Sequence, residues 1–110
     1  MNYETACKLL IKQTIKTEDN PDAILKRMNQ GQPPVPGQIT SILLALKVVE
    51  EVLKDKGSID KDLASALFLI TVKTQQLFTA GIKSGVDWPP LLKEDLLRIG
   101  SACESIFSGV

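Results

Sequence analysis

Proline and glycine divide this chain of 110 residues into five segments, and within each segment apolar residues recur at spacings of three and four. That spacing gathers apolar side chains on one face of an α-helix, whereas a half-buried strand needs strict alternation. The pattern therefore predicts an all-α fold, a bundle of about five helices. A chain of this length has room for one hydrophobic core, so we expect a single domain over residues 1–110.

Start and stop signals set the expected limits of each helix. Asn2 can cap the first helix, Asn20 before a proline the second, and Ser58 or Asp60 the fourth. Glycine often follows the last residue of a helix, so Gly31 and Gly57 mark expected ends. The expected helices cover residues 3–17, 21–30, 39–56, 60–80 and 89–108.

The segment QPPVPGQITSILLALK, residues 32–47, places three prolines and a glycine directly before a strongly apolar run. A proline near the first turn of a helix loses no helical hydrogen bond, because those amide groups are unpaired anyway. The same letters contain a P-x-x-P motif, which another protein could bind as an extended ligand. We favour the helix start, because it accounts for every residue of the segment.

The third and fourth expected helices are apolar on more than one side. We expect them to form the central antiparallel pair of the bundle. Apolar surface that five short helices leave uncovered can be buried in a two-fold homodimer. The candidate interface residues are Leu44, Val48, Val52, Phe68, Leu69 and Val72.

The sequence shows no recognisable catalytic constellation. It contains no histidine, which removes the commonest general base, the Ser-His and Cys-His pairs and most transition-metal sites. Neighbouring carboxylates such as Glu50 and Glu51 point about 100° apart on a helix and cannot share a proton. Lys83-Ser84 resembles the end of a phosphate loop, but the required glycines are absent. We expect no catalytic residue, metal or cofactor.

Charge and hydropathy bear on partners and location. Thirteen basic residues balance thirteen acidic ones, so we expect no nucleic-acid partner. The longest apolar run, residues 63–72, is about half of the roughly 20 residues that a membrane-spanning helix needs, so we expect no membrane segment. Cys7 and Cys103 lie near opposite ends of the sequence, without the close spacing of a metal site, and we expect both to pack in the core as small apolar residues. No export signal is visible. These features predict a cytoplasmic location.

The segment from Gly81 to Pro90 is the most distinctive region outside the expected core, and it holds the only tryptophan. Trp88 can be an exposed anchor for a partner, or it can seat the last helix on the core. We favour the second interpretation. Lys83, Asp87 and Trp88 are the candidate loop site, and with Glu94 they could line a small-molecule pocket.

Three segments carry a resemblance: PPVPGQITSILLALKVV, QLFTAGIKSGVDWPPLLKEDLLRI and the terminal SIFSGV. Over almost its full length the chain resembles a family of small, uncharacterised, all-helical cyanobacterial proteins. Some members of that family carry the name dethiobiotin synthetase, an ATP-dependent ring-closing enzyme. That enzyme resembles an α/β P-loop protein, and this sequence has neither the loop nor the strands, so we expect the label not to apply.

Together these observations predict a non-catalytic helical interaction module that self-associates, most simply as a homodimer. One alternative is a small-molecule binder or histidine-free enzyme with a pocket beside Trp88. Another is an adaptor that docks onto a larger complex through the same apolar stripes. The mass of the protein in solution, ligand titration and partner capture distinguish the three.

Overall fold

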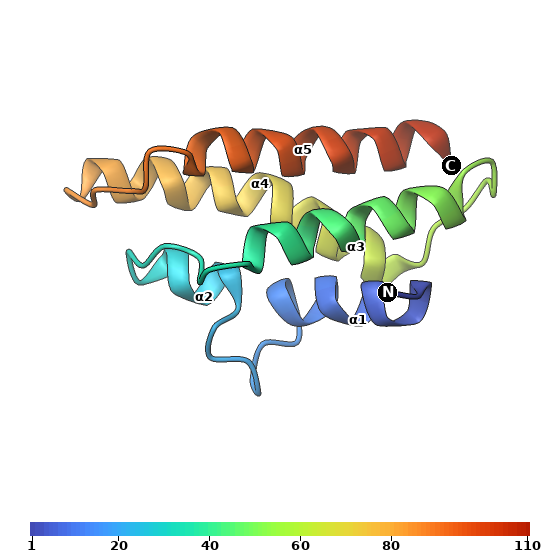
Figure 1. The fold of residues 1–110 in the computed structure, drawn as a ribbon, viewed down its shortest axis with the longest axis horizontal. Helices are drawn as coiled ribbons and strands as arrows, with labels where there is room; N and C mark the ends of the chain where they lie inside the picture. The colour runs from blue at the N-terminus through green and yellow to red at the C-terminus, as the bar shows by residue number, and fades with distance from the viewer.

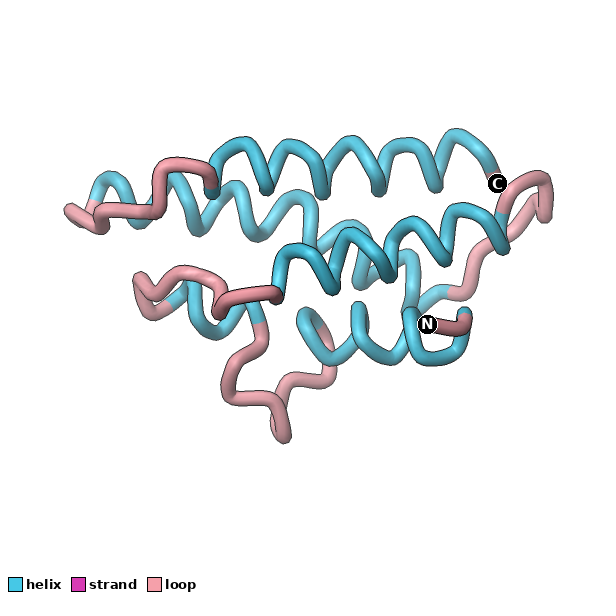
Figure 2. Tube along the Cα trace, viewed as in Figure 1, coloured by secondary structure: helices cyan, strands magenta, loops and turns pink.

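The computed structural model describes residues 1–110 and contains helices and loops but no strand (Figure 2). This confirms the expected all-α fold with five helices. The helices are α1 (Tyr3–Thr14), α2 (Ile24–Asn29), α3 (Gln38–Leu53), α4 (Lys61–Lys83) and α5 (Leu92–Gly109).

Four long helices form an up-and-down bundle, and the short α2 lies at one end of it (Figure 1). Helix α3 packs against α1 and α5, whereas α4 packs against α1, α2 and α5. Figure 1 shows α5 and α1 at opposite edges, with α3 in front of them and α4 behind.

The expected pairing of α3 with α4 is therefore wrong. The two helices run in opposite directions, but they occupy diagonal corners of the bundle, separated by α1 and α5. The physical reason is that α3 and α4 carry apolar residues on two sides, the same pattern from which their pairing was predicted. A helix that is apolar on two sides needs two neighbours, and α1 and α5 supply one neighbour for each side of α3 and of α4.

One continuous cluster of 19 buried apolar residues forms the core. The apolar spacing places one stripe of each helix on this core: Ile42, Leu46 and Val49 of α3 and Ile99 and Ile106 of α5 are all buried. Phe107, next to Ile106 on α5, is 45% exposed. None of the helices combines the length and hydropathy needed to cross a membrane.

Helix starts follow the expected caps at two places. The Asn2 side chain accepts a hydrogen bond from the Thr5 amide, and the Asp60 side chain accepts from the amides of Asp62 and Leu63. Helix α2 begins three residues later than expected. Its expected cap, Asn20, instead donates its side-chain amide to the Lys12 carbonyl and so completes the end of α1.

Helix ends depart from the expectation at two glycine-containing segments. Helix α3 ends at Leu53, three residues before the expected end at residue 56. It ends there because Asp55 adopts a left-handed conformation, with φ 61°, and donates its amide to the Gly109 carbonyl. Helix α4 continues through Gly81 to Lys83. Gly81 does not break the helix; its missing side chain leaves the space in which the ring of Trp88 packs.

Candidate functional site

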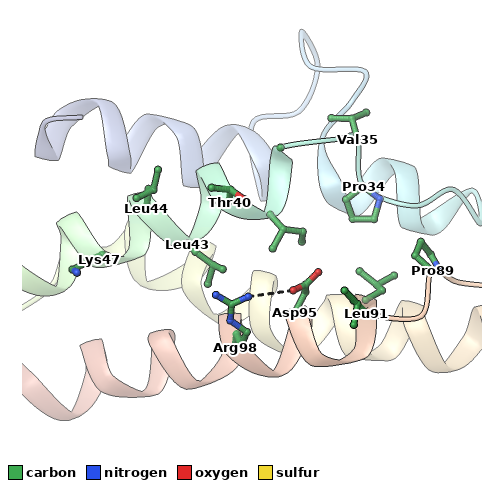
Figure 3. A pocket seen from close by; sticks show the side chains of 13 residues that line it. Pro34, Val35, Thr40, Leu43, Leu44, Lys47, Pro89, Leu91, Asp95 and Arg98 are labelled. Atoms are coloured by element: carbon green, nitrogen blue, oxygen red, sulfur yellow. Dashed lines mark hydrogen bonds and ion pairs between the residues drawn. The ribbon is translucent and has the colours of Figure 1, made fainter.

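A groove of about 530 Å³ runs between the N-terminal halves of α3 and α5. Both helices begin at the same end of the bundle (Figure 1). The proline segments that precede them therefore lie together, and Pro34 and Pro89 both line the groove. The walls are mostly apolar side chains of these segments and of the two helices. They include Pro34, Val35, Ile39, Leu43, Leu91 and Leu92 (Figure 3).

Charged groups lie toward the other end of the groove. Arg98 pairs with Asp95 one turn before it on α5, with 3.5 Å between nitrogen and oxygen (Figure 3). Lys47 of α3 also lines the groove and makes no ion pair within the chain, because the other two ion pairs join residues elsewhere. The groove therefore combines apolar walls with one free cation.

The candidate interface residues do not form one surface. Those of α3 and those of α4 lie on helices at diagonal corners, so their outward faces point to opposite sides of the bundle. Leu44 and Phe68 are mainly exposed, whereas Val48 packs against the core. Sequence reasoning missed this split because a linear pattern does not say which helices are neighbours. On α3 the residues are Leu44, Val48 and Val52; on α4 they are Phe68, Leu69 and Val72.

Trp88 is buried, as favoured from the sequence, and is not an exposed anchor. Its indole nitrogen donates a hydrogen bond to the Phe78 carbonyl at 2.9 Å, and the two rings stack with 6.0 Å between their centroids. Lys83 and Asp87 are exposed, and neither they nor Trp88 line the groove. Lys83 instead lines a separate shallow cavity of about 430 Å³ on α4, and Gly81, Ser84 and Val86 line another of about 310 Å³, so the pocket expected beside Trp88 stays a prediction.

A polar network that the sequence did not suggest holds the α1–α3 region together. The buried Gln38 side chain donates to Oε1 of Gln13 and to the Asp22 carbonyl, and it accepts from the Val35 amide. Gln13 also accepts from the amide of Ile24, the first residue of α2. Nothing in the sequence distinguishes these glutamines from surface residues, because their role depends on partners far along the chain.

Both cysteines are free and in environments that keep them protonated. Burial raises the pKa of the Cys103 thiol, and the neighbouring Thr71 hydroxyl offsets part of this rise. Burial also raises the pKa of Cys7, with the neighbouring Tyr3 hydroxyl offsetting part of the rise, and burial raises the pKa of Tyr3 to about 12. Because the thiolate is the reactive form of cysteine, these environments favour packing over covalent chemistry.

The remaining acidic side chains and thiols do not gather into a metal site. No group of three or more carboxylate or thiol side chains comes close enough to hold a metal ion. Two of the acids have separate structural roles, since Asp60 caps α4 and Asp95 pairs with Arg98. The groove between α3 and α5 joins exposed apolar side chains to an unpaired lysine.

Comparison with protein-family models, with curated proteins and with solved structures gives no match for this chain.

Proposed function

We propose that this chain is a non-catalytic helical interaction module that associates with a second copy of itself. The observation that carries the proposal is the groove between α3 and α5, whose edges bear leucines that are more than half exposed. Removing apolar surface from water favours association by about 25 cal/mol for each Å² that the complex buries, before the cost of bringing two molecules together. Two such side chains beside an apolar groove favour association over an isolated monomer.

The balanced charge of the chain is compatible with self-association. Two copies with a formal net charge of zero do not repel each other at long range. The second apolar stripes of α3 and α4 contribute less to the proposal than the sequence suggested, because α1 and α5 cover part of them. The groove itself carries the argument.

The absolute mass in solution tests this function. Light scattering after size-exclusion chromatography, over a wide range of protein concentration, should give a mass approaching twice the 12.0 kDa of one chain. Circular dichroism of the same samples should show an unchanged helical content. A mass that stays at that of one chain at every concentration contradicts the proposed self-association.

A small-molecule binder is the second candidate, because the groove volume of about 530 Å³ lies within the range typical of ligand sites. Lys47 and Arg98 would favour an amphipathic ligand with an anionic group. Thermal-shift measurements with a panel of anionic metabolites test this function. A ligand at this site should raise the melting temperature of the parent protein but not that of an Arg98→Ala, Lys47→Ala variant.

A further inference from the structure

The outer face of the α4–α5 pair carries a second group of exposed apolar side chains, apart from the groove. Phe68 and Ile82 of α4 are 59% and 56% exposed, and Leu97 and Phe107 of α5 are 53% and 45% exposed. They are four of the nine large apolar side chains that the fold leaves exposed, and none of them lines the groove. The surface that holds these four residues is called the α4–α5 face below.

Gly100 shows how the two helices lie against each other at this face. Helices α4 and α5 are antiparallel neighbours (Figure 1). A Cβ at Gly100 would lie 3.5 Å from Thr71 and 3.7 Å from Gln75, so residue 100 of α5 is level with residues 71–75 of α4. Positions three, four or seven residues from these lie on the same side of each helix. The side of α5 that carries Leu97 and the side of α4 that carries Phe68 therefore adjoin.

On α5 this side carries Lys93, Leu97, Gly100 and Glu104, at spacings of four, three and four residues. Such spacing is that of the seam between two packed helices. Turned end for end about the point between residues 98 and 99, the stripe sets Lys93 opposite Glu104. It also sets Leu97 opposite Gly100, so a large apolar side chain meets a residue that has none. Lys93 and Glu104 are exposed, and neither makes an ion pair within the chain.

On α4 the matching side carries Phe68, Thr71, Gln75, Thr79 and Ile82, and its spacing is symmetric about Gln75. Turned end for end about Gln75, it sets Phe68 opposite Ile82 and threonine opposite threonine. None of these positions carries a charge. Because residue 100 of α5 is level with residues 71–75 of the antiparallel α4, the point between residues 98 and 99 is level with Gln75. One axis therefore serves both helices.

We propose that two copies first pair through the α4–α5 face, about a two-fold axis that passes Gln75 on α4 and the point between residues 98 and 99 on α5. Each α5 then packs antiparallel on α5 of the other copy, and each α4 on α4. This inference rests on the proposed self-association and specifies its first contact. The groove lies on the other flank of α5, so in this pair it stays open on both copies.

Charge favours a second copy as the occupant of this face, and it selects α5 as the partner of α5. In the proposed pair, Lys93 of each copy meets Glu104 of the other, so two ion pairs form. Packing α5 on α4 of the other copy would leave both charges without a counter-charge, because the α4 stripe is uncharged. Exposed ion pairs contribute little affinity, but they set the orientation of a complex. A two-fold dimer requires a face that is its own complement, whereas an unrelated partner does not.

Aspartate substitutions at two matched leucines test which surface forms the dimer. Leu97 on the α4–α5 face is 53% exposed, and Leu44 in the groove is 54% exposed. Sedimentation equilibrium should show that Leu97→Asp raises the dimer dissociation constant at least about tenfold, while Leu44→Asp leaves it nearly unchanged. Both positions are at the surface, and circular dichroism should show the parent helical content in both variants.

Charge exchange tests the orientation of the two copies. Lys93→Glu alone and Glu104→Lys alone each place like charges opposite one another at two symmetric contacts, so each should raise the dissociation constant about threefold or more. The double variant Lys93→Glu, Glu104→Lys restores opposite charges and should return the dissociation constant to near the parent value. Lys73→Glu, at an exposed position on another side of α4, is the control for net charge and should have little effect.

Cross-linking on the axis tests its position. Gln75 of one copy faces Gln75 of the other, so Gln75→Cys by itself should give a disulfide-linked dimer on mild oxidation. Gln76 is also exposed but points about 100° away on α4, so Gln76→Cys should not. The parent protein measures any background from Cys7, which is partly exposed.

The outcomes separate this interface from self-association itself. A dimer that Leu44→Asp weakens and Leu97→Asp does not is formed through the groove, which overturns this interface and leaves self-association standing. A double charge variant as weak as the single variants, or a Gln76→Cys protein that cross-links as well as Gln75→Cys, overturns the proposed axis. A parent with the mass of one chain at every concentration overturns both the interface and the proposed function.

Discussion

Gln38, the first residue of α3, donates a hydrogen bond to Oε1 of Gln13 near the end of α1, with 2.8 Å between the two atoms. The same Gln38 nitrogen donates to the Asp22 carbonyl at 2.7 Å. Two side chains 25 positions apart thus join α1, the loop before α2 and the start of α3. The Gln38 side chain also accepts a hydrogen bond from the Val35 amide, and it thereby holds the proline segment at one end of the groove.

Gln38→Ala should destabilise the fold by about 2 kcal/mol, because it leaves buried polar partners such as Oε1 of Gln13 with fewer hydrogen bonds. Urea unfolding followed by circular dichroism measures the loss. Gln32→Ala, at an exposed glutamine before the prolines, should have almost no effect. Equal effects of the two substitutions would mean that the network contributes nothing to stability.

Gly81→Ala and Gly100→Ala should change stability in opposite directions. Both glycines lie within helices, where alanine is favoured by about 1 kcal/mol. A Cβ at Gly81 would lie 2.5 Å from the ring of Trp88, whereas one at Gly100 would lie at an ordinary 3.5 Å from Thr71. Displacing the indole also weakens its hydrogen bond to Phe78, so we expect a net loss of about 1–2 kcal/mol at Gly81.

Thermal unfolding and tryptophan fluorescence measure these effects. Gly81→Ala should lower the melting temperature and shift the emission of Trp88 to longer wavelength as the ring becomes more exposed. Gly100→Ala should raise the melting temperature, with the parent emission spectrum. An unshifted spectrum in a destabilised Gly81→Ala protein would contradict the proposed displacement of the ring.

Asp55→Gly should stabilise the protein by about 0.5–1 kcal/mol. Asp55 has a positive φ of 61°, which costs energy for a residue with a side chain and almost none for glycine. The backbone hydrogen bond to Gly109 does not need the carboxylate and should remain. Chemical unfolding gives the difference. The exposed neighbouring Lys56, also changed to glycine, is the control and should not gain stability.

The unfolding free energy should fall as pH rises above about 9, in part because of Cys103. Burial raises the pKa of the folded thiol above its ordinary value of 9.0, so the unfolded chain loses this proton first. Below pH 9.0 both states keep the proton, and this contribution to stability is fully present. Between the two pKa values the unfolded state binds fewer protons, and stability is lost.

Urea unfolding at a series of alkaline pH values checks this dependence. Cys103→Val should show a shallower decline than the parent from pH 9.0 upward, since valine has no proton to lose. Tyr3→Phe should remove a later part of the decline, between pH 10.0 and about 12. Identical slopes in the parent and in Cys103→Val would show that the thiol does not contribute.

Helix content could be predicted well because it depends on local patterns. The caps at Asn2 and Asp60 and the core stripe through Ile42, Leu46 and Val49 each follow from residues within one or two turns. The limits of helices were predicted less well where a distant group intervened. Asn20 completes α1 instead of starting α2, and Asp55 bonds to the far end of α5.

The candidate site depended on which helices are neighbours, and the sequence could not supply that. The apolar outer residues Leu44 and Phe68 looked alike in the sequence, yet they lie on diagonal helices that face opposite sides. The groove joins α3 to α5, two helices separated in the chain by the whole of α4. No local spacing reports such a relationship.

By itself the sequence determined that the chain forms helices, where most of them begin, and which stripe of each faces the core, because hydrophobic periodicity and capping act over a few residues. Only the tertiary structure decided that α3 and α4 lie diagonally, that Trp88 fills the space left by Gly81, and that α3 and α5 border a groove. These features depend on packing between distant segments, where shape and volume decide which of several apolar faces meet.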